Sequence, residues 1–293
     1  MIVPCSEIRE FVKNDLKNKV KLLSEEGIYP RLVTLHVGDS EEQVSYVRIK
    51  EKTAEELGIT FEYIHIPKAP PLFKFMQLLK EHCMSPSVTG IIIQQPLPPR
   101  LQSDTIYNFI PQPKEIEGHR AKSPHIAPLG QAVLSALKYI YIKQEISEHL
   151  YPNLQEDPSQ FKSLFKSKKI VLLGNGLTGG KPIGDTLTQF KINYININSQ
   201  TPNPQEYIEQ ADIIISAVGK KVLDPTLLKK DVVLLNVGLH KDGKTLVGDY
   251  DESEIKDVAS WYTPTPGGLG PIDVLYLYKN LIDAARMKVV TRR

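Results

Sequence analysis

The chain has 293 residues, and its 36 Lys and Arg against 34 Asp and Glu give a net charge of +2. That balance argues against a nucleic-acid-binding protein, because neutralising phosphates requires a surplus of basic side chains. No apolar run approaches the roughly 20 residues of a membrane helix. The N-terminus becomes polar too early for a signal peptide. The length predicts two domains.

The two cysteines, Cys5 and Cys83, lie far apart and have no His or Cys at the spacing of metal ligands. We therefore expect neither a disulfide framework nor a metal site. A reducing compartment is the simplest interpretation of such cysteine usage, so we expect a cytoplasmic protein.

Helix-like and strand-like segments alternate through the first half of the chain. Helical spacing of apolar residues predicts helices over 6–26, 45–57 and 73–82, and β-rich runs predict strands over 31–37, 61–66 and 90–94. This alternation indicates βαβ units and a mainly parallel sheet. The continuous apolar run of 90–93 is typical of a strand that is covered on both faces.

A second alternation begins at Lys169. It predicts strands over 169–173, 194–197, 211–216 and 232–236, a helix over 182–189 and a final helix over 272–287. The intervening residues 132–167 predict a linker helix followed by a surface insertion, since 151–158 is polar and carries prolines.

A glycine-rich loop joins the first strand of the second half to its helix. It reads Gly174-Asn175-Gly176-Leu177-Thr178-Gly179, a G-x-G-x-x-G in the context that this motif needs. Glycines let the backbone approach a pyrophosphate, which the helix N-terminus then stabilises. The loop predicts a dinucleotide site; a glycine-rich turn that binds nothing is the alternative.

The residues after this loop indicate which nucleotide is bound. No Asp or Glu occurs in 195–201, where NAD-binding versions place a carboxylate on the ribose. Its absence removes repulsion against a 2′-phosphate, but no Arg stands there either. Lys181 either contacts that phosphate or is a solvated lysine of the first helical turn. We expect NADP, with NAD possible.

Polar residues in the first half form a second candidate site. Tyr46 and Lys50 share one helix face, being four residues apart, and Gln94 ends the apolar strand where ligands bind in parallel sheets. Glu115 and Glu117 lie just before Gly118. On spacing alone, an exposed Tyr–Lys pair and a solvated charge run are the alternatives. The dense Pro and Gly of 263–271 indicate a rigid loop that brings its backbone close to a ligand.

These motifs, in this order, resemble the bifunctional methylenetetrahydrofolate dehydrogenase/methenyltetrahydrofolate cyclohydrolase family from about Arg31 to Ala285. The matching segments are 264–271 (PTPGGLGP), 46–50 (YVRIK), 90–98 (GIIIQQPLP), 211–219 (ADIIISAVG), and Val237-Gly238 before Gly248-Asp249. The resemblance implies a two-domain α/β fold with a cleft between the domains. A three-layer catalytic domain would span 1–135 and be completed by 272–293, with the C-terminal helix returning to it. A Rossmann domain with a parallel sheet would span 136–271 and form a homodimer.

The implied activity is oxidation of 5,10-methylenetetrahydrofolate with NAD(P)+, then hydrolysis of the methenyl product to 10-formyltetrahydrofolate. The resemblance assigns the hydrolytic step to Lys50, orientation or stacking of the folate to Tyr46, and a hydrogen bond to the lysine to Gln94. A lysine beside a cationic carbon in a partly desolvated pocket loses its proton more easily, so it can transfer protons near neutral pH. Hydride transfer needs only orientation and exclusion of water.

The resemblance also carries over two sets of binding residues. Substrate-binding positions would be Tyr46, Gln94, Glu117, Gly118, Pro266, Gly267, Gly268 and Asp273. Cofactor-binding positions would be Gly174, Asn175, Gly176, Gly179, Gly180, Lys181, Pro182, Ser199, Ala217, Val218, Gly219 and Gly238.

Several positions depart from the family pattern. Glu115 and Glu117 replace aspartates, and an extra methylene moves each carboxylate. The other departures are Gln43 for Ser, 127–130 (APLG) for T-P-[KR]-G, Asn175 and Gly176 for Arg and Ser, Asn236 for Asp, Asp273 for Thr, and a longer linker over 145–165. They leave two alternatives, a monofunctional dehydrogenase or cyclohydrolase and a non-catalytic folate- or nucleotide-binding paralogue. The retained Lys50 argues against the second.

Overall fold

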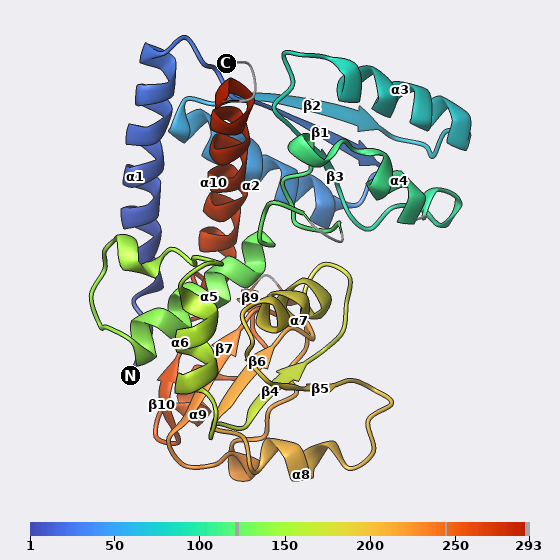
Figure 1. The fold of residues 1–293 in the computed structure, drawn as a ribbon. Coiled ribbons are helices and arrows are strands. Elements are labelled where there is room, and N and C mark those ends of the chain that lie inside the picture. The colour runs from blue at the N-terminus through green and yellow to red at the C-terminus, as the bar shows by residue number, and fades with distance from the viewer. Residues whose placement is uncertain (103, 121–122, 244, 291–293) are drawn as a thin grey trace. The chain divides into compact units, whose positions relative to one another are not determined.

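The structure, a computed structural model, describes residues 1–102, 104–120, 123–243 and 245–290 (Figure 1). The chain divides into two compact units, Met1–Phe11 with Leu129–Asp273 and Val12–Pro128 with Val274–Arg293. Each contains one parallel sheet, so we call them the five-stranded and the three-stranded unit. Helices α1 (Cys5–Glu25) and α10 (Leu269–Val290) contribute residues to both. Within the described ranges, no helix combines the length and apolarity needed to cross a membrane.

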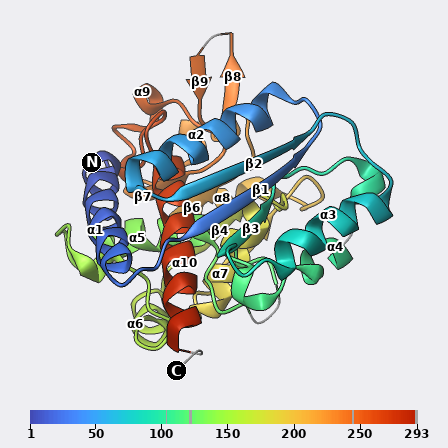
Figure 2. The ribbon, with the colours of Figure 1, turned by 90° about the horizontal axis from the view of Figure 1, so that it is seen from above.

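The three-stranded unit has the strand order β2-β1-β3, with every pair parallel. Its strands are β1 (Arg31–Val37), β2 (Thr60–Ile66) and β3 (Gly90–Ile93), and its further helices are α2 (Glu41–Leu57), α3 (Leu72–Met84) and α4 (Asp104–Phe109). Figure 2 shows α2 on one side of the strands and α3 and α4 on the other. One core joins β1 and β3 to α3 and α4 through Val33, Leu35, Ile91, Phe75, Leu79 and Ile106. The unit is a three-layer α/β structure, as predicted.

The five-stranded unit has the order β10-β7-β6-β4-β5, also entirely parallel. Its strands are β4 (Ile170–Leu173), β5 (Ile195–Ile197), β6 (Ile213–Ser216), β7 (Val232–Asn236) and β10 (Ala259–Tyr262). Every residue of β4, β6 and β7 is buried, which explains their continuous apolar sequences. The chain order reverses between β4 and β6, the position where doubly wound sheets bind ligands.

Helices and one antiparallel hairpin complete this unit. They are α5 (Pro128–Tyr141), α6 (Asp157–Leu164), α7 (Gly180–Gln189), α8 (Pro204–Ile208), α9 (Glu252–Ile255), and the hairpin of β8 (His240–Asp242) and β9 (Thr245–Val247). Short 3-10 turns lie at Pro99–Leu101, Gln112–Lys114, Glu148–Leu150 and Pro225–Leu227.

Several sequence predictions need correction, among them the final helix expected over 272–287, which spans Leu269–Val290. The helix expected over 45–57 begins at Glu41, because Ser40 adopts the extended N-cap geometry and its side chain accepts a hydrogen bond from the Gln43 N–H. The segment expected as a surface insertion contains α6, and Asp157 and Phe161 within it are buried. Its polar residues therefore lie inside the five-stranded unit as well as on its surface.

Candidate functional site

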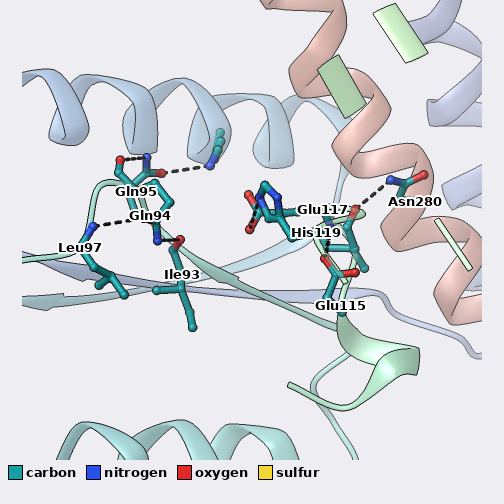
Figure 3. Close-up of polar contacts among 10 residues, drawn as sticks. Ile93, Gln94, Gln95, Leu97, Glu115, Glu117, His119 and Asn280 are labelled. Atoms are coloured by element: carbon teal, nitrogen blue, oxygen red, sulfur yellow. Dashed lines mark hydrogen bonds and ion pairs between the residues drawn. The ribbon is translucent and has the colours of Figure 1, made fainter. Parts of the chain in front are cut away.

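Helix α2 and the end of β3 bring two of the predicted catalytic residues together. The Nζ of half-buried Lys50 donates to Oε1 of Gln94 at 3.0 Å, and Nε2 of Gln94 donates to the Gln95 carbonyl at 3.0 Å (Figure 3). The second bond orients the amide so that its oxygen faces the ammonium. Tyr46, one turn earlier on α2, leaves 42% of its surface exposed. Lys50 is therefore held in a fixed position, whereas the Tyr46 ring is open to a ligand.

Two side chains of helix α10 donate hydrogen bonds to the backbone of segments near this pair. The hydroxyl of Tyr278 donates to the Lys50 carbonyl at 2.5 Å. Nδ2 of Asn280 donates to the carbonyls of Ile116 and Ile126 at 2.8 and 2.9 Å. Sequence reasoning missed Tyr278 and Asn280, because nothing in their spacing distinguishes them from other residues of an apolar helix.

The acidic segment after the turn at Gln112–Lys114 is folded, which excludes the alternative of a solvated charge run. Lys114 and Glu115 are buried, and Oε1 of Glu115 accepts from the backbone N–H of Glu117 and of His119 at 2.9 and 3.2 Å. Gly118 has φ +72°, and a Cβ there would lie 2.6 Å from the Ala127 nitrogen, so only glycine fits. Glu115 thus shapes the turn that presents Glu117.

In the view of Figure 3, Glu117 lies between Gln94 and Glu115. Its Oε2 is 3.8 Å from Nε2 of His119. Burial raises the pKa of the Glu117 carboxyl, and the charge of Glu115 adds to that, whereas His119 and the Lys50 ammonium lower it. A carboxylate poised in this way can accept hydrogen bonds from a ring N–H or amino group of a ligand.

In the five-stranded unit, the glycine-rich loop follows β4 and opens α7. Gly174 has φ +99°, and a Cβ on it would lie 2.6 Å from the Ala217 carbonyl oxygen; a Cβ on Gly180 would lie 2.3 Å from the Gly174 oxygen. A Cβ on Gly176 would meet nothing within 4 Å. The turn therefore requires two glycines for its own packing and leaves its outer face open beside the N-terminus of α7. Those features fit a dinucleotide pyrophosphate.

A buried carboxylate organises the neighbouring loop, and sequence reasoning did not select it. Asp249 is fully buried and accepts from the Ser216 hydroxyl at 2.5 Å and the Val218 N–H at 2.8 Å. It also accepts from the N–H groups of Gly219 and Lys220 at 2.9 and 3.0 Å. The only signal was a Gly-Asp pair after a β-rich run.

The same carboxylate explains another predicted glycine. A Cβ on Gly238 would lie 2.3 Å from Oδ1 of Asp249. Asn236, at the end of β7, accepts from the Asp249 N–H at 3.0 Å and donates to the Thr265 hydroxyl at 2.9 Å. Predicted cofactor residues after β4, β6 and β7 are thereby held at the carboxyl ends of parallel strands.

Close contacts hold the Pro- and Gly-rich loop, whose composition predicted a rigid loop. The Thr265 N–H donates to Oε1 of Glu252 at 2.6 Å, and a Cβ on Gly268 would lie 2.4 Å from the Pro264 oxygen. Gly267 has φ +93°. Pro266, between these residues, and Asp273 belong to the five-stranded unit.

The region expected to select the nucleotide contains no acidic side chain within 195–201. The Asn196 amide donates to the Gly174 carbonyl at 2.7 Å, which holds the loop to β5. Ser199 is exposed. The Lys181 ammonium forms an exposed pair with Asp185 at 2.5 Å, so it has a partner on its own helix.

These features define a class of protein: an α/β enzyme with a dinucleotide-binding unit and a second unit that presents a lysine, a glutamine and a carboxylate. Family models identify the class further. Residues 3–117 match the tetrahydrofolate dehydrogenase/cyclohydrolase catalytic domain, and residues 159–289 match the NAD(P)-binding domain of the same family. The chain therefore belongs to the tetrahydrofolate dehydrogenase/cyclohydrolase family.

Individual relatives agree with this assignment. The chain is 33% identical to the bifunctional protein FolD of Oceanobacillus iheyensis over 282 residues, 96% of this chain and 95% of that protein. It is 28% identical to FolD of Lysinibacillus sphaericus, covering 98% of each. Among solved structures, the bifunctional FolD of Campylobacter jejuni superposes with a TM-score of 0.85 at 25% identity, over 98% of this chain and 99% of that one.

Proposed function

We propose that this chain oxidises 5,10-methylenetetrahydrofolate with NADP+ and hydrolyses the resulting 5,10-methenyltetrahydrofolate to 10-formyltetrahydrofolate. Membership of the dehydrogenase/cyclohydrolase family supports both activities. The single observation that carries the hydrolytic half is the 3.0 Å hydrogen bond between the Lys50 ammonium and Gln94.

The domain assignment is part of the proposal. The folate-catalytic domain is 1–135 completed by 272–293, and the dinucleotide domain is 136–271. The match of the catalytic-domain model to 3–117 supports the first. The compact units differ from these bounds, since Met1–Phe11 groups with the five-stranded unit and the division falls at Leu129. The resemblance supports the proposed homodimer. The buried free cysteines support the proposed cytoplasmic location.

In the oxidation, the nicotinamide supplies the hydride acceptor when it is bound. The residues of the chain need only orient the folate and exclude water, because no proton moves at the reacting carbon. We assign orientation to the open ring of Tyr46 and to the Glu117 carboxylate, which suits the N–H groups of a pterin. Gln94 and Gly118 are the other substrate-binding residues that we propose in the three-stranded unit, and Pro266, Gly267, Gly268 and Asp273 are those that we propose in the five-stranded unit.

In the hydrolysis, water adds to the cationic methenyl carbon and loses a proton, which gives a neutral hydroxyl adduct. The bond from that carbon to N5 then breaks as N5 gains a proton and the hydroxyl loses its own to become the formyl carbonyl, so one proton is released overall. Lys50 is the group that we assign to this proton transfer. Gln94 keeps its Nζ in place. A positioned proton-transfer group contributes ~10²- to 10⁴-fold in rate.

The nucleotide assignment is NADP, with NAD accepted less well. The absence of an acidic side chain in 195–201 removes the usual repulsion against the 2′-phosphate. We assign the pyrophosphate to the Gly174–Gly180 turn and the nicotinamide end to 217–219 and Gly238, which Asp249 holds.

The first test is turnover of 5,10-methylenetetrahydrofolate with NADP+ or NAD+, following reduced nucleotide and methenyl product separately. Lys50→Gln should keep the dehydrogenase within a few-fold and lower hydrolysis ~10²-fold or more. Lys52→Gln, the same exchange at an exposed position of α2, is the matched control. Unchanged hydrolysis by Lys50→Gln would overturn the role of Lys50.

The outcome also separates the alternatives. Reduced nucleotide with accumulating methenyl product would identify a monofunctional dehydrogenase and point to Glu117, whose extra methylene departs from the family. Hydrolysis of added methenyl substrate without any oxidation would identify a monofunctional cyclohydrolase. No turnover of either kind, with folate still bound, would favour the non-catalytic paralogue.

A further inference from the structure

A series of hydrogen-bonded side chains in the three-stranded unit runs from β2 through β1 to α2 and the loop after β3. The Tyr63 hydroxyl on β2 is 2.7 Å from Nδ1 of His36 on β1, and Nε2 of His36 is 3.1 Å from Oε1 of Gln43. Nε2 of Gln43 then donates to the Pro96 carbonyl at 2.7 Å. His36 is fully buried and Gln43 is 6% exposed, so water does not compete for these bonds.

Each bond in this series has a fixed direction. The Pro96 carbonyl can only accept, so the Gln43 amide must turn its nitrogen to Pro96 and its oxygen to His36. Nε2 of His36 therefore carries the proton. Burial lowers the His36 pKa, so the imidazole is neutral near pH 7 and its bare Nδ1 accepts from the Tyr63 hydroxyl.

The series ends on the two elements that carry Lys50 and Gln94. Gln43 precedes Lys50 by seven residues, two turns along the same face of α2. Pro96 follows Gln94 by two residues in the loop after β3, which Figure 3 shows beside the helix. The helix and the loop are thus joined twice, by Gln43 to Pro96 and by Lys50 to Gln94.

We propose that Tyr63, His36 and Gln43 are positioning residues for the hydrolytic step, setting the loop after β3 at the distance from α2 that the Lys50–Gln94 bond requires. None of the three contacts the reacting atoms. The inference rests on the proposed function, because it acts through Lys50. It also gives a role to Gln43, which departs from the serine of the family: its longer amide spans from His36 to Pro96.

The test uses Gln43→Glu in the full-length protein. The change keeps the side-chain shape, but replaces the donor to Pro96 by a carboxylate oxygen facing a carbonyl. Hydrolytic kcat should fall ~10- to 100-fold, as expected for misplacement of a catalytic group, with dehydrogenase kcat/KM changed less than threefold. Glu42→Gln, the reverse exchange at the exposed neighbouring residue, is the control and should alter neither activity.

A second pair of variants keeps the inference testable if Gln43→Glu unfolds. His36→Gln retains an N–H that can donate to Gln43, and His36→Leu does not. We expect His36→Gln to keep hydrolytic kcat within about threefold and His36→Leu to lose it, at equal melting temperatures. Parallel loss of both activities, or equal hydrolysis by the two variants, would overturn the positioning role.

Lys50→Gln, assayed beside these variants, distinguishes a failure of the proposed role of Lys50 from a failure of the positioning role. If Lys50→Gln still hydrolyses the methenyl substrate, the proposed function of Lys50 fails and the positioning role fails with it. If Lys50→Gln loses hydrolysis while Gln43→Glu keeps it, only the positioning role is overturned.

Discussion

Asn175 occupies the exposed part of the glycine-rich loop, and Lys181, on the first turn of the following helix, pairs with Asp185. We predict that Asn175→Arg raises the ratio of kcat/KM for NADP+ over NAD+ about tenfold, because a charge-assisted hydrogen bond to the 2′-phosphate contributes about 1.5–3 kcal/mol. Steady-state kinetics with both nucleotides measure this ratio.

The matched control is Gln189→Arg, which adds the same charge at the exposed far end of α7, about 15 Å along the helix axis. It should leave the ratio unchanged at moderate ionic strength, where such a distance exceeds the screening length. An equal increase in both variants would mean that net charge, rather than a contact with the phosphate, sets nucleotide selectivity.

Single residues also show where sequence reasoning stops. Tyr46, Lys50 and Gln94 were selected through the resemblance to the family, because spacing alone left an exposed Tyr–Lys pair as an alternative. The burial of the charged residues Lys114 and Glu115 could not be predicted from the sequence. Lys114 donates to the carbonyls of His82, Cys83 and Ser85 at 3.2, 2.7 and 2.6 Å, which close the end of α3. Such partners are distant in sequence, so no local sequence pattern predicts these hydrogen bonds.

At the scale of elements, the segment between α5 and β4 is held by a buried ion pair. Nζ of Lys138 lies 2.8 and 2.7 Å from the two oxygens of Asp157, and it also donates to the Tyr151 carbonyl at 3.1 Å. We predict that Asp157→Ala lowers the free energy of unfolding by about 3–5 kcal/mol, because it leaves the Lys138 ammonium buried without a counter-charge. Chemical denaturation measures this loss.

Two further variants identify the cause. Replacing both partners, Lys138→Met with Asp157→Leu, should recover most of the lost stability, since the pair is then exchanged for apolar side chains of similar size. Asp185→Ala breaks an exposed pair and should change stability little. If the double variant is as unstable as Asp157→Ala, the loss arises from the hydrogen bond of Asp157 to the Asn153 N–H rather than from the unpaired charge.

The elements that sequence predicted best are those with a single dominant signal. Strands β1 and β7 were predicted with their observed bounds, since each is a β-rich run with clear ends. Strand β10 was missed, because Ala259–Tyr262 is only four residues and includes a Ser, and its pairing with β7 shifts register after Ala259. Its position in the sheet depends on β7, which no local pattern contains.

At the scale of the whole molecule, the strand orders follow from pairing between distant segments. The sequence indicated parallel sheets through continuous apolar strands, but not that β1 would lie between β2 and β3, or β6 between β4 and β7. Orders of this kind are restricted by right-handed crossovers rather than by residue type. The resemblance to a family added the division into two domains and the return of the C-terminal helix, but no strand order.

The last prediction concerns how stability depends on pH. Burial lowers the pKa of both His36 and His125 below 6.5, and both belong to the three-stranded unit. Above pH 6.5 both imidazoles are neutral in the folded and unfolded chain. As the pH falls below that value the unfolded chain binds protons first, so stability is lost progressively towards the lowered pKa of the folded state.

Glu117 contributes in the opposite direction over part of this range. Its pKa is raised above 4.5, so its stabilising contribution is present below that pH and is lost as the pH rises through the folded value. Because two histidines act against one carboxyl, we expect the midpoint temperature of unfolding to decrease as the pH is lowered from 7.5 to 5. Since all three groups lie in one unit, the shift should appear in the transition of that unit if the two unfold separately.

Calorimetry from pH 7.5 to 5 tests this expectation, with His36→Gln combined with His125→Gln as the diagnostic variant. Removing both imidazoles should flatten the dependence, or reverse it slightly because the raised pKa of Glu117 stabilises the folded state as the pH falls. His149→Gln, a half-buried histidine of the five-stranded unit, is the control and should leave the slope as it was. An undiminished slope in the double variant would show that the two imidazoles are already as easily protonated in the folded chain as in the unfolded one.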